Sequence, residues 1–375
     1  MSSERYEKRG VSSDKSEVHH AIKSLDKGIF SNSFCKILED ITCHDPEFCN
    51  VMHADTAGTK TNLAYLYWKE TQDLSVWEDI VQDALVMNLD DMACSGFTND
   101  FIISSTIGRN KNCIPSDVLS TLINGAQKFA ANLKSHGINL YLAGGETADV
   151  GDVVRTVDVG FTAFARTKRS NIINIHIQEG DLIVGFASYG QASYESKYNS
   201  GIGCNGLTSA RHDLFSKYYK DKYPETFDPA IPESLVYSGS KRLTDELEIN
   251  GQRYHIGKLL LSPTRTFLPV LKLVIESHMS NIHGIIHNTG GGLSKVNKFL
   301  PHNLKAVKDK ILPIPPIFNL IQSEANISEV QMAEVFNMGT RLEIYIPDEK
   351  LALDIIAIAQ SFNIEASIIG RVEKK

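Results

Sequence analysis

The sequence lacks the signatures of several large classes of protein. Its 375 residues include six cysteines, and no two of them have the C-x-x-C spacing that is typical of zinc sites. No apolar run approaches the length of a membrane span, and the charged start, MSSERYEKRG, is unlike a signal peptide. The net charge is −7, so the chain has no basic excess for nucleic acid. We therefore expect a reduced, cytoplasmic protein that binds neither nucleic acid nor membrane.

The common motifs of covalent catalysis are also missing. Neither the G-x-S-x-G of a nucleophilic serine nor the H-E-x-x-H of a metalloprotease occurs. What is present is an ordinary globular composition, 42% hydrophobic and 22% charged, together with 26 glycines. The length suggests two domains. Acids, a few lysines and glycine-rich segments favour positioning and electrostatics, on which phosphoryl transfer mostly depends.

Hydrophobic periodicity predicts a mixed α/β (α+β) fold in two units. A polar stretch, RTKRSN, marks the expected boundary, giving domains 1–168 and 169–375. Residues 189–257 look like a long irregular excursion. Helices are predicted over 76–95, 117–135, 267–278, 293–299 and 350–362. Strands are predicted over 138–145, which should be buried, and over 153–165, 180–188, 283–287, 341–347 and 366–372.

The helix over 76–95 should have two faces, with Ser75 and Glu78 as a capping box at its start. One face is apolar and holds Trp77, Ile80, Val81, Ala84, Leu85 and Met92. The other is expected to face solvent and holds Glu78, Asp79, Gln82, Asp83 and Asp90. Asn88, Asp91 and Ser95 fall inside the apolar face, which predicts a buried polar cluster. Alternatively, the helix ends before Asp90 and both acids are exposed.

Three short segments have the composition of ligand-binding loops. In DTAGTK (55–60), small residues separate Asp55 from Lys60, as in a phosphate and metal loop, although on this pattern alone a surface turn with an incidental ion pair is the more common outcome. GGETAD (144–149) follows a predicted strand, where a plain glycine turn is the alternative to a ligand site. HNTGGGL (287–293) precedes a predicted helix, so it could bind an anion or simply begin a helix above a buried histidine.

Further segments complete an ordered series along the chain. The whole series is YEKRGV (6–11), DTAGTK (55–60), LDDMACSG (89–96), GGETAD (144–149), CNG (204–206), LSPTR (261–265), HNTGGGL (287–293), FNMG (336–339) and IGRV (369–372). In this order the chain resembles the phosphoribosylformylglycinamidine cyclo-ligase, or aminoimidazole ribonucleotide (AIR) synthase, family nearly from end to end. Each segment alone is a weak match, whereas the order is specific.

The resemblance implies a two-domain fold whose N-terminal domains pair through a shared β-barrel into a homodimer. It also implies the ATP-dependent closure of formylglycinamidine ribonucleotide to aminoimidazole ribonucleotide in purine biosynthesis, with ATP and Mg²⁺. The implied catalytic residues are Lys60, Asp91 and His287. The implied nucleotide contacts are Asp55, Gly58, Thr59, Lys60, Gly144 and Gly145, and the implied metal ligands are Asp55, Asp91 and Glu146. The implied substrate contacts are Asn205, Gly206, Thr289, Gly290, Gly291 and Gly292.

The chain departs from the family pattern at a few positions near these segments. Asp90 stands where the family usually has Asn, Gly203 stands where a histidine is common, and residues 191–203 look inserted. Related ATP-dependent enzymes, such as thiamine-monophosphate kinase and selenophosphate synthetase, share the first-half acids but lack the second-half segments. They are one alternative, and an inactive nucleotide-binding homologue is the other.

Overall fold

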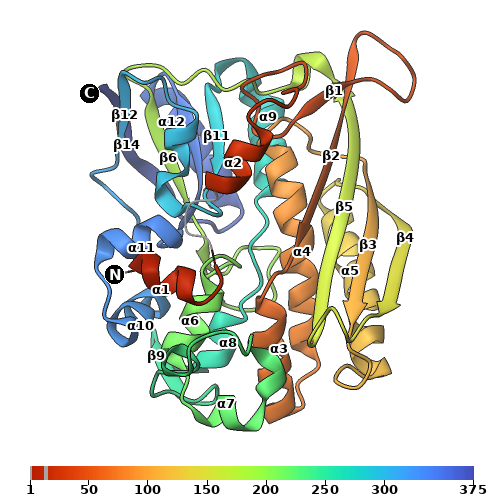
Figure 1. Cartoon of the computed structure of the whole chain (residues 1–375). Helices are drawn as coiled ribbons and strands as arrows, with labels where there is room; N and C mark the ends of the chain where they lie inside the picture. Colours follow the sequence, from red (N-terminus) through yellow and green to blue (C-terminus); the bar gives the residue numbers. More distant parts are fainter. Residues whose placement is uncertain (1, 12–15) are drawn as a thin grey trace.

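The first half of the chain folds into a curled, half-barrel sheet with helices on its inner side (Figure 1). The computed structural model describes residues 2–11 and 16–375, so Met1 and residues 12–15 of the charged N-terminal stretch lie outside the described residues. Across this first sheet the strand order is β1 (Ile37–Glu39), β2 (Phe48–Thr56), β5 (Val157–Lys168), β3 (Phe101–Arg109) and β4 (Leu140–Asp149). Only the β3–β4 pair is parallel.

The strand at the edge of this sheet differs from the prediction. Residues 138–145 were expected to form a buried strand, whereas β4 runs from Leu140 to Asp149 and is largely exposed. An edge strand has a neighbour on one side only, and among the described residues the outer-facing side chains of β4, such as Tyr141, remain exposed. Apolar residues in β4 therefore do not imply burial within one chain.

Three helices lie on the inner side of the first sheet: α3 (Lys60–Thr71), α4 (Ser75–Ala93) and α5 (Ser116–Ser135). The prediction for α5 is confirmed, because Leu122, Phe129 and Leu133 are buried while its opposite face is exposed. The prediction of a capping box at the start of α4 is wrong, since Leu74 occupies the N-cap position and makes no side-chain hydrogen bond there. The predicted solvent face of α4 is also wrong, because its acids are covered by the second half of the chain.

The second half forms another five-stranded sheet, in which all neighbours are antiparallel. Helix α12 (Glu349–Ser361) packs against it, and α9 (Leu268–His278) contacts both α12 and α4. The predicted helix over 293–299 is instead a short 3₁₀ helix, η5 (Gly292–Lys298). The strand order is β11 (Gly284–His287), β13 (Thr340–Ile346), β6 (Leu182–Ala187), β14 (Ala366–Lys374) and β12 (Leu304–Val307).

The segment expected to be an irregular excursion, 189–257, is in fact compact. Its tyrosines explain the error, because Tyr219 and Tyr237 are fully buried. Their rings pack at steep angles against other aromatic rings instead of facing water. Its elements are β7 (Tyr189–Gly190), β8 (Asn199–Ser200), α6 (Leu207–Leu214), α7 (Tyr218–Lys222), β9 (Glu246–Ile249), β10 (Gln252–His255) and α8 (Ile256–Leu260).

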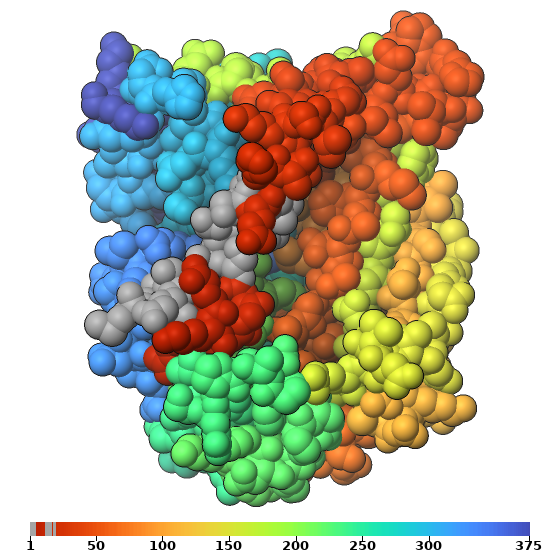
Figure 2. All heavy atoms as spheres, viewed as in Figure 1, coloured from red at the N-terminus to blue at the C-terminus, as the bar shows by residue number. Residues whose placement is uncertain are grey.

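One hydrophobic core runs through both halves of the chain. Buried residues from Cys35 to Ala366 belong to a single cluster, and a smaller cluster lies on the other face of the second sheet. The N-terminal helix α1 (Ser2–Lys8) lies near α6, and just after it Arg9 pairs with Asp213 at 2.6 Å. Figure 2 shows the N-terminal residues, in red, lying between the blue C-terminal part and the orange strands. The two halves therefore share a core and a covering segment.

The remaining helices and strands complete the list of elements. They are α2 (Ser16–Ile22), α10 (Pro316–Ala325), α11 (Glu329–Val335), and the short 3₁₀ helices η1 (Arg169–Asn171), η2 (Pro224–Thr226), η3 (Glu233–Leu235) and η4 (Met279–Asn281). None of the helices in the described part of the chain has the length and hydropathy needed to cross a membrane. All six cysteines are free thiols.

Candidate functional site

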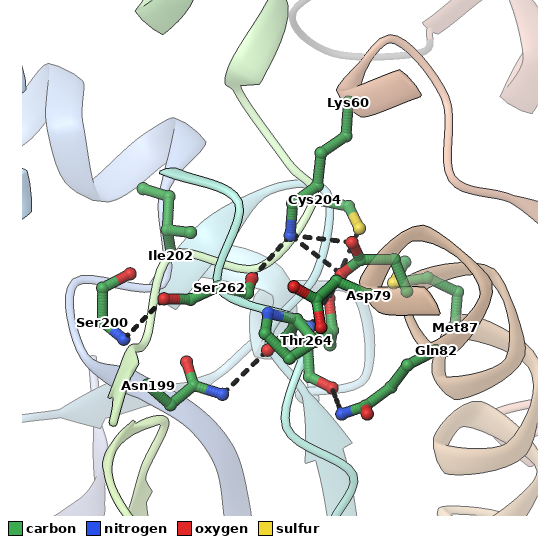
Figure 3. Close-up of polar contacts among 12 residues, drawn as sticks. Lys60, Asp79, Gln82, Met87, Asn199, Ser200, Ile202, Cys204, Ser262 and Thr264 are labelled. Carbon is green, nitrogen blue, oxygen red and sulfur yellow. Dashed lines mark hydrogen bonds and ion pairs between the residues drawn. The ribbon is translucent and has the colours of Figure 1, made fainter. Parts of the chain in front are cut away.

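The lysine of the DTAGTK segment points into the protein and not toward the loop that precedes it. Lys60 is the first residue of α3 and is fully buried. Its Nζ donates to Asp83 Oδ1 at 2.9 Å and to the Ser262 carbonyl at 2.7 Å (Figure 3). The expected cation of a phosphate loop is thus held at the contact between α4 and the LSPTR segment.

The LSPTR segment supplies the donors that the acidic face of α4 needs. Asp83 Oδ1 accepts hydrogen bonds from the backbone N–H and the hydroxyl of Thr264, at 2.7 and 2.6 Å. One residue earlier, Gln82 donates to the Thr264 carbonyl at 2.9 Å, as Figure 3 shows. Asp79 pairs with Lys197 at 2.7 Å. A face that looks solvent-exposed in the sequence is buried because its partners come from distant parts of the chain.

Asp90 continues this buried face. It accepts hydrogen bonds from the Thr266 hydroxyl and from the Phe267 backbone N–H, both at 2.7 Å. Burial raises the pKa of Asp90 to about 7, because these two neutral donors do not offset the cost of an ionised carboxylate. The expectation that Asp90 faces solvent is wrong.

Asp91 turns toward a different set of partners, and its predicted burial is confirmed. Its Oδ1 lies 2.7 Å from His287 Nδ1, and its Oδ2 lies 3.7 Å from His53 Nε2. Burial alone would raise the pKa of Asp91, but the charge of Lys295 and the hydrogen bond from His287 outweigh burial and lower it to about 2. Asn88 and Ser95 are also buried, as expected, so this end of α4 holds an ionised carboxylate within a polar cluster.

His287 has protein partners on both ring nitrogens. Nδ1 donates to Asp91, and Nε2 accepts from Arg341 Nε at 3.0 Å. Burial lowers the pKa of His287 to about 4, because a charged ring would be desolvated and would face Arg341. The imidazole is therefore neutral at pH 7 and links the first half of the chain, through Asp91, to Arg341 in the second half.

The loop between β2 and α3 is open and touches the CNG region. Gly58 has a φ of +56° and open space where a side chain would begin. The Thr59 hydroxyl lies 2.6 Å from that of Thr208 in α6, two residues after CNG ends. The predicted nucleotide loop and the start of the predicted substrate region are thus in direct contact.

The predicted substrate residues of the second half gather around the TGGG turn. A β-carbon added to Gly290 would lie 3.7 Å from Asn205 Nδ2. Asn205 Oδ1 is buried and has no hydrogen-bond partner among the described residues. Gly206 and Gly292 both have positive φ and pack tightly beside Phe336, so they shape the backbone of this region. Thr289 is buried next to His287.

Glu146 does not lie with the other two predicted metal ligands. Strand register aligns Glu146 with Thr106, Gly160 and Thr56, which places it on the outer face of the sheet. Asp55 is one residue away from Thr56 and therefore lies on the inner face, since successive strand residues alternate. Within the described residues, no three His, Cys, Asp or Glu side chains form a group that could hold a metal ion.

Gly144 and Gly145 have a structural role in this arrangement. They line a cavity of about 320 Å³, mostly apolar, between β4 and α5, which also contains Ile103 and Leu142. A β-carbon on Gly145 would lie 2.1 Å from the Ser105 carbonyl, so glycine is required there for the strands to pair.

Sequence reasoning missed three residues of the site: His53, Lys295 and Arg341. Arg341 follows FNMG by two positions, and Lys295 follows the TGGG turn by three. Those adjacencies were the available signal. The contacts that bring the residues to Asp91 and His287 arise only from the tertiary fold.

Two family descriptions match the chain in succession. "AIR synthase related protein, N-terminal domain" matches residues 38–167, and "AIR synthase related protein, C-terminal domain" matches residues 178–375. The chain belongs to the AIR synthase related family. The phosphoribosylformylglycinamidine cyclo-ligase of Methanococcus vannielii is 30% identical over 306 residues, which is 79% of this chain and 72% of that protein.

Solved structures share the fold of this AIR synthase related chain. AaThiL complexed with AMPPCP and TMP superposes with a TM-score of 0.55 at 12% identity, covering 97% of this chain and 91% of that one. T. maritima PurL complexed with FGAR gives a TM-score of 0.55 at 13% identity. That match covers 98% of this chain and 51% of PurL, so the chain spans about half the length of PurL. The expected two-part AIR-synthase-like fold is confirmed.

Proposed function

We propose that this protein is a phosphoribosylformylglycinamidine cyclo-ligase, which uses ATP to close formylglycinamidine ribonucleotide to aminoimidazole ribonucleotide in purine biosynthesis. The observation that carries the proposal is the hydrogen bond between the side chains of Asp91, in the first-half acid segment, and His287, in HNTGGGL. Relatives that carry the cyclo-ligase name align over most of the chain, so they include both segments. Neither segment alone would distinguish this reaction from that of a kinase.

The proposed reaction transfers and then releases a phosphoryl group. The formyl amide oxygen of the substrate attacks the γ-phosphorus of ATP, and ADP leaves. An amidine nitrogen then attacks the activated carbon, a C–N bond forms, the C–O bond breaks, phosphate leaves and the nitrogen loses a proton. The protein must therefore hold two anions close together and exclude water between the steps.

The open loop after β2 is the proposed contact for the ATP phosphates. Gly58 leaves room for a close approach to the backbone, and Thr59 offers a hydroxyl. Lys60, at the base of this loop, contributes positive charge from its buried position beside Asp83. The nucleotide-bound neighbour AaThiL supports a nucleotide site in this fold.

Two of the three predicted acids suit Mg²⁺ that arrives with ATP. Mg²⁺ is commonly held by one or two carboxylates together with phosphate oxygens. Asp55, on the inner face of β2, and Asp91, on α4, are the proposed protein ligands, whereas Glu146 lies on the opposite face of the sheet. The ion would supply positive charge to the phosphate oxygens.

The proposed role of His287 is to position Asp91. Its two nitrogens are engaged, so it fixes the carboxylate without itself exchanging a proton at pH 7. Asn205, Gly206 and the TGGG turn are the proposed contacts of the ribonucleotide. The PurL neighbour is described with FGAR, a related ribonucleotide, which supports a substrate of this type.

We also propose a homodimer formed through the outer face of the first sheet, located in the cytoplasm. A row of apolar residues crosses four strands in register: Met52, Phe164, Ile102 and Tyr141. Met52, Ile102 and Tyr141 are 65%, 46% and 55% exposed, which is unusual for aligned apolar side chains. A second copy with the same row would cover them.

The test is an assay of the purified protein with formylglycinamidine ribonucleotide, ATP and Mg²⁺ that follows ADP and aminoimidazole ribonucleotide together. Equal amounts of both products are expected, together with loss of turnover in Asp91→Asn. ATP hydrolysis without the imidazole product would instead point to a kinase of the same fold. No nucleotide-dependent stabilisation would favour an inactive homologue.

A further inference from the structure

A lysine beside the TGGG turn is held rigidly and faces the site. Lys295 lies on η5, and its Nζ donates to the Thr289 hydroxyl. The same Nζ lies 4.5 Å from the centroid of the Phe34 ring, which in turn stacks on Phe299 at 5.5 Å. A hydroxyl and an aromatic face therefore fix the ammonium group, which reduces the entropy lost when it binds a ligand.

Among the described residues Lys295 makes no direct ion pair, although its charge acts on nearby Asp91, whereas the other lysine near the turn is paired. Lys308 Nζ lies 2.6 Å from both Glu343 Oε1 and the Leu293 carbonyl. Its charge is therefore neutralised by Glu343, and its bond to Leu293 holds the chain just after the turn. Within residues 2–11 and 16–375, no ion pair of 4.0 Å or less joins Lys295 to a carboxylate. Lys295 thus presents positive charge at a partly exposed position.

Other groups beside the turn are suited to an oxyanion. Asn205 Nδ2 lies next to Gly290, and the buried Asn205 Oδ1 has no partner among the described residues. Gly291 has a φ of +99°, a backbone conformation that other residues rarely adopt. A fixed ammonium, an amide and a hydroxyl around glycine backbone are the groups that commonly bind a phosphate monoester.

We propose that Lys295 binds the 5′-phosphate of the ribonucleotide substrate. This inference rests on the proposed function and adds a specificity residue outside the segments that suggested it. The ATP phosphates have their own proposed contacts at Gly58 and Thr59, in a loop that touches α6. A lysine that serves the substrate phosphate alone should affect the ribonucleotide and leave ATP binding unchanged.

The test uses ribose 5-phosphate as a probe that binds without turnover. Calorimetry should show binding to the wild-type protein and an affinity about 10- to 100-fold lower for Lys295→Met, the range expected when a charged hydrogen bond is lost. In the cyclo-ligase assay, the KM for the ribonucleotide should rise by a similar factor while the KM for ATP stays within about two-fold. Lys295→Arg should keep most of the affinity.

The matched control is Lys305→Met, which removes one positive charge from β12, where Lys305 lies 3.9 Å from Glu373. It should behave as wild type in both measurements. Equal affinity of wild type and Lys295→Met for ribose 5-phosphate, or no binding to either, would overturn the assignment. Lys295-dependent binding without imidazole formation would retain the phosphate site and overturn the proposed function, so the two failures are distinguishable.

Discussion

Asp90 and Asp91 are neighbours in the sequence with opposite electrostatic environments. Burial raises the pKa of Asp90 to about 7, because its two neutral donors and the nearby charge of Arg341 do not offset the cost of ionisation. Asp91 faces Lys295 and His287, and its pKa falls to about 2. Adjacent residues on a helix point about 100° apart, which is enough to place one carboxylate against the LSPTRTF segment and the other against HNTGGGL. Only Asp91 is ionised across the physiological range.

Asp90→Asn should stabilise the protein at alkaline pH. A folded-state pKa above the unfolded value means that the stability from Asp90 is present below about pH 4 and is lost as pH rises toward 7. Asparagine cannot ionise; its Oδ1 can accept from the Phe267 N–H, and its amide can donate to the Thr266 hydroxyl, which then accepts instead of donating. We expect about 1–3 kcal/mol more unfolding free energy than wild type at pH 8 and roughly a third of that gain at pH 5. Urea denaturation at both pH values checks this, with the exposed Asp354→Asn as control; identical pH profiles would refute it.

Lys60→Met should destabilise the protein as well as lower its turnover. The variant leaves Asp83 buried without its cation, which typically costs about 3–5 kcal/mol. Both side chains of this pair are fully buried, so water cannot replace the lost charge. The double variant Lys60→Met/Asp83→Asn should recover most of the stability but not the turnover. Recovery of both in the double variant would show that Lys60 serves only the fold.

At the scale of single elements, α4 and α5 show how far sequence periodicity can be trusted. Both have a clear apolar face, and for α5 the polar face is indeed exposed. For α4 the polar face is buried, because hydrogen-bond donors arrive from Lys60, Lys197 and residues 264–267. A helical wheel identifies which residues share a face, but the partner of that face lies far away in sequence and leaves no local signal.

Gly292→Ala should disrupt the TGGG turn. Gly292 has a φ of +51°, and an added β-carbon would lie 2.3 Å from the Ala333 carbonyl at α11. The atoms that the β-carbon would meet belong to the backbone, which cannot move aside without a cost. We therefore expect the free energy of unfolding to fall by about 1–3 kcal/mol or more. Gly290→Ala is the control, since its β-carbon would meet only Asn205 Nδ2 at 3.7 Å. Equal melting temperatures for the two variants would contradict this account of the turn.

At the scale of the whole molecule, the outer face of the first sheet is the surface that one chain leaves uncovered. Ile102→Glu places a charge in the middle of the aligned apolar row and should shift the protein from dimer to monomer. Leu353→Glu, on the exposed side of α12, removes a similarly exposed apolar residue (57%) away from the sheet and should leave the assembly unchanged. Light scattering coupled to size exclusion measures both. A wild-type protein that is monomeric at micromolar concentration would rule out the proposed dimer.

The candidate site was predictable in its parts and not in its assembly. Short segments such as HNTGGGL identified His287 and the glycines, because their composition is local. The grouping of Asp55 with Glu146 failed on strand parity: the two lie on opposite faces of one sheet, and register across four strands cannot be read from either segment. The inward orientation of the Lys60 side chain was not predicted, because its two hydrogen-bond acceptors, Asp83 and Ser262, lie in opposite halves of the chain.

The shared burial of α4 also has a consequence for synthesis on the ribosome. Asp90 and the hydroxyl that satisfies it, on Thr266, are 176 positions apart. At about 5–20 residues per second, α4 waits on the order of 10–35 s for residues 262–267 to be translated. During that interval Asp90 lacks its two later donors, and Asp83 has Lys60 but not the backbone and hydroxyl of Thr264. We expect folding of the first half to stay reversible until the later segment emerges and supplies these donors.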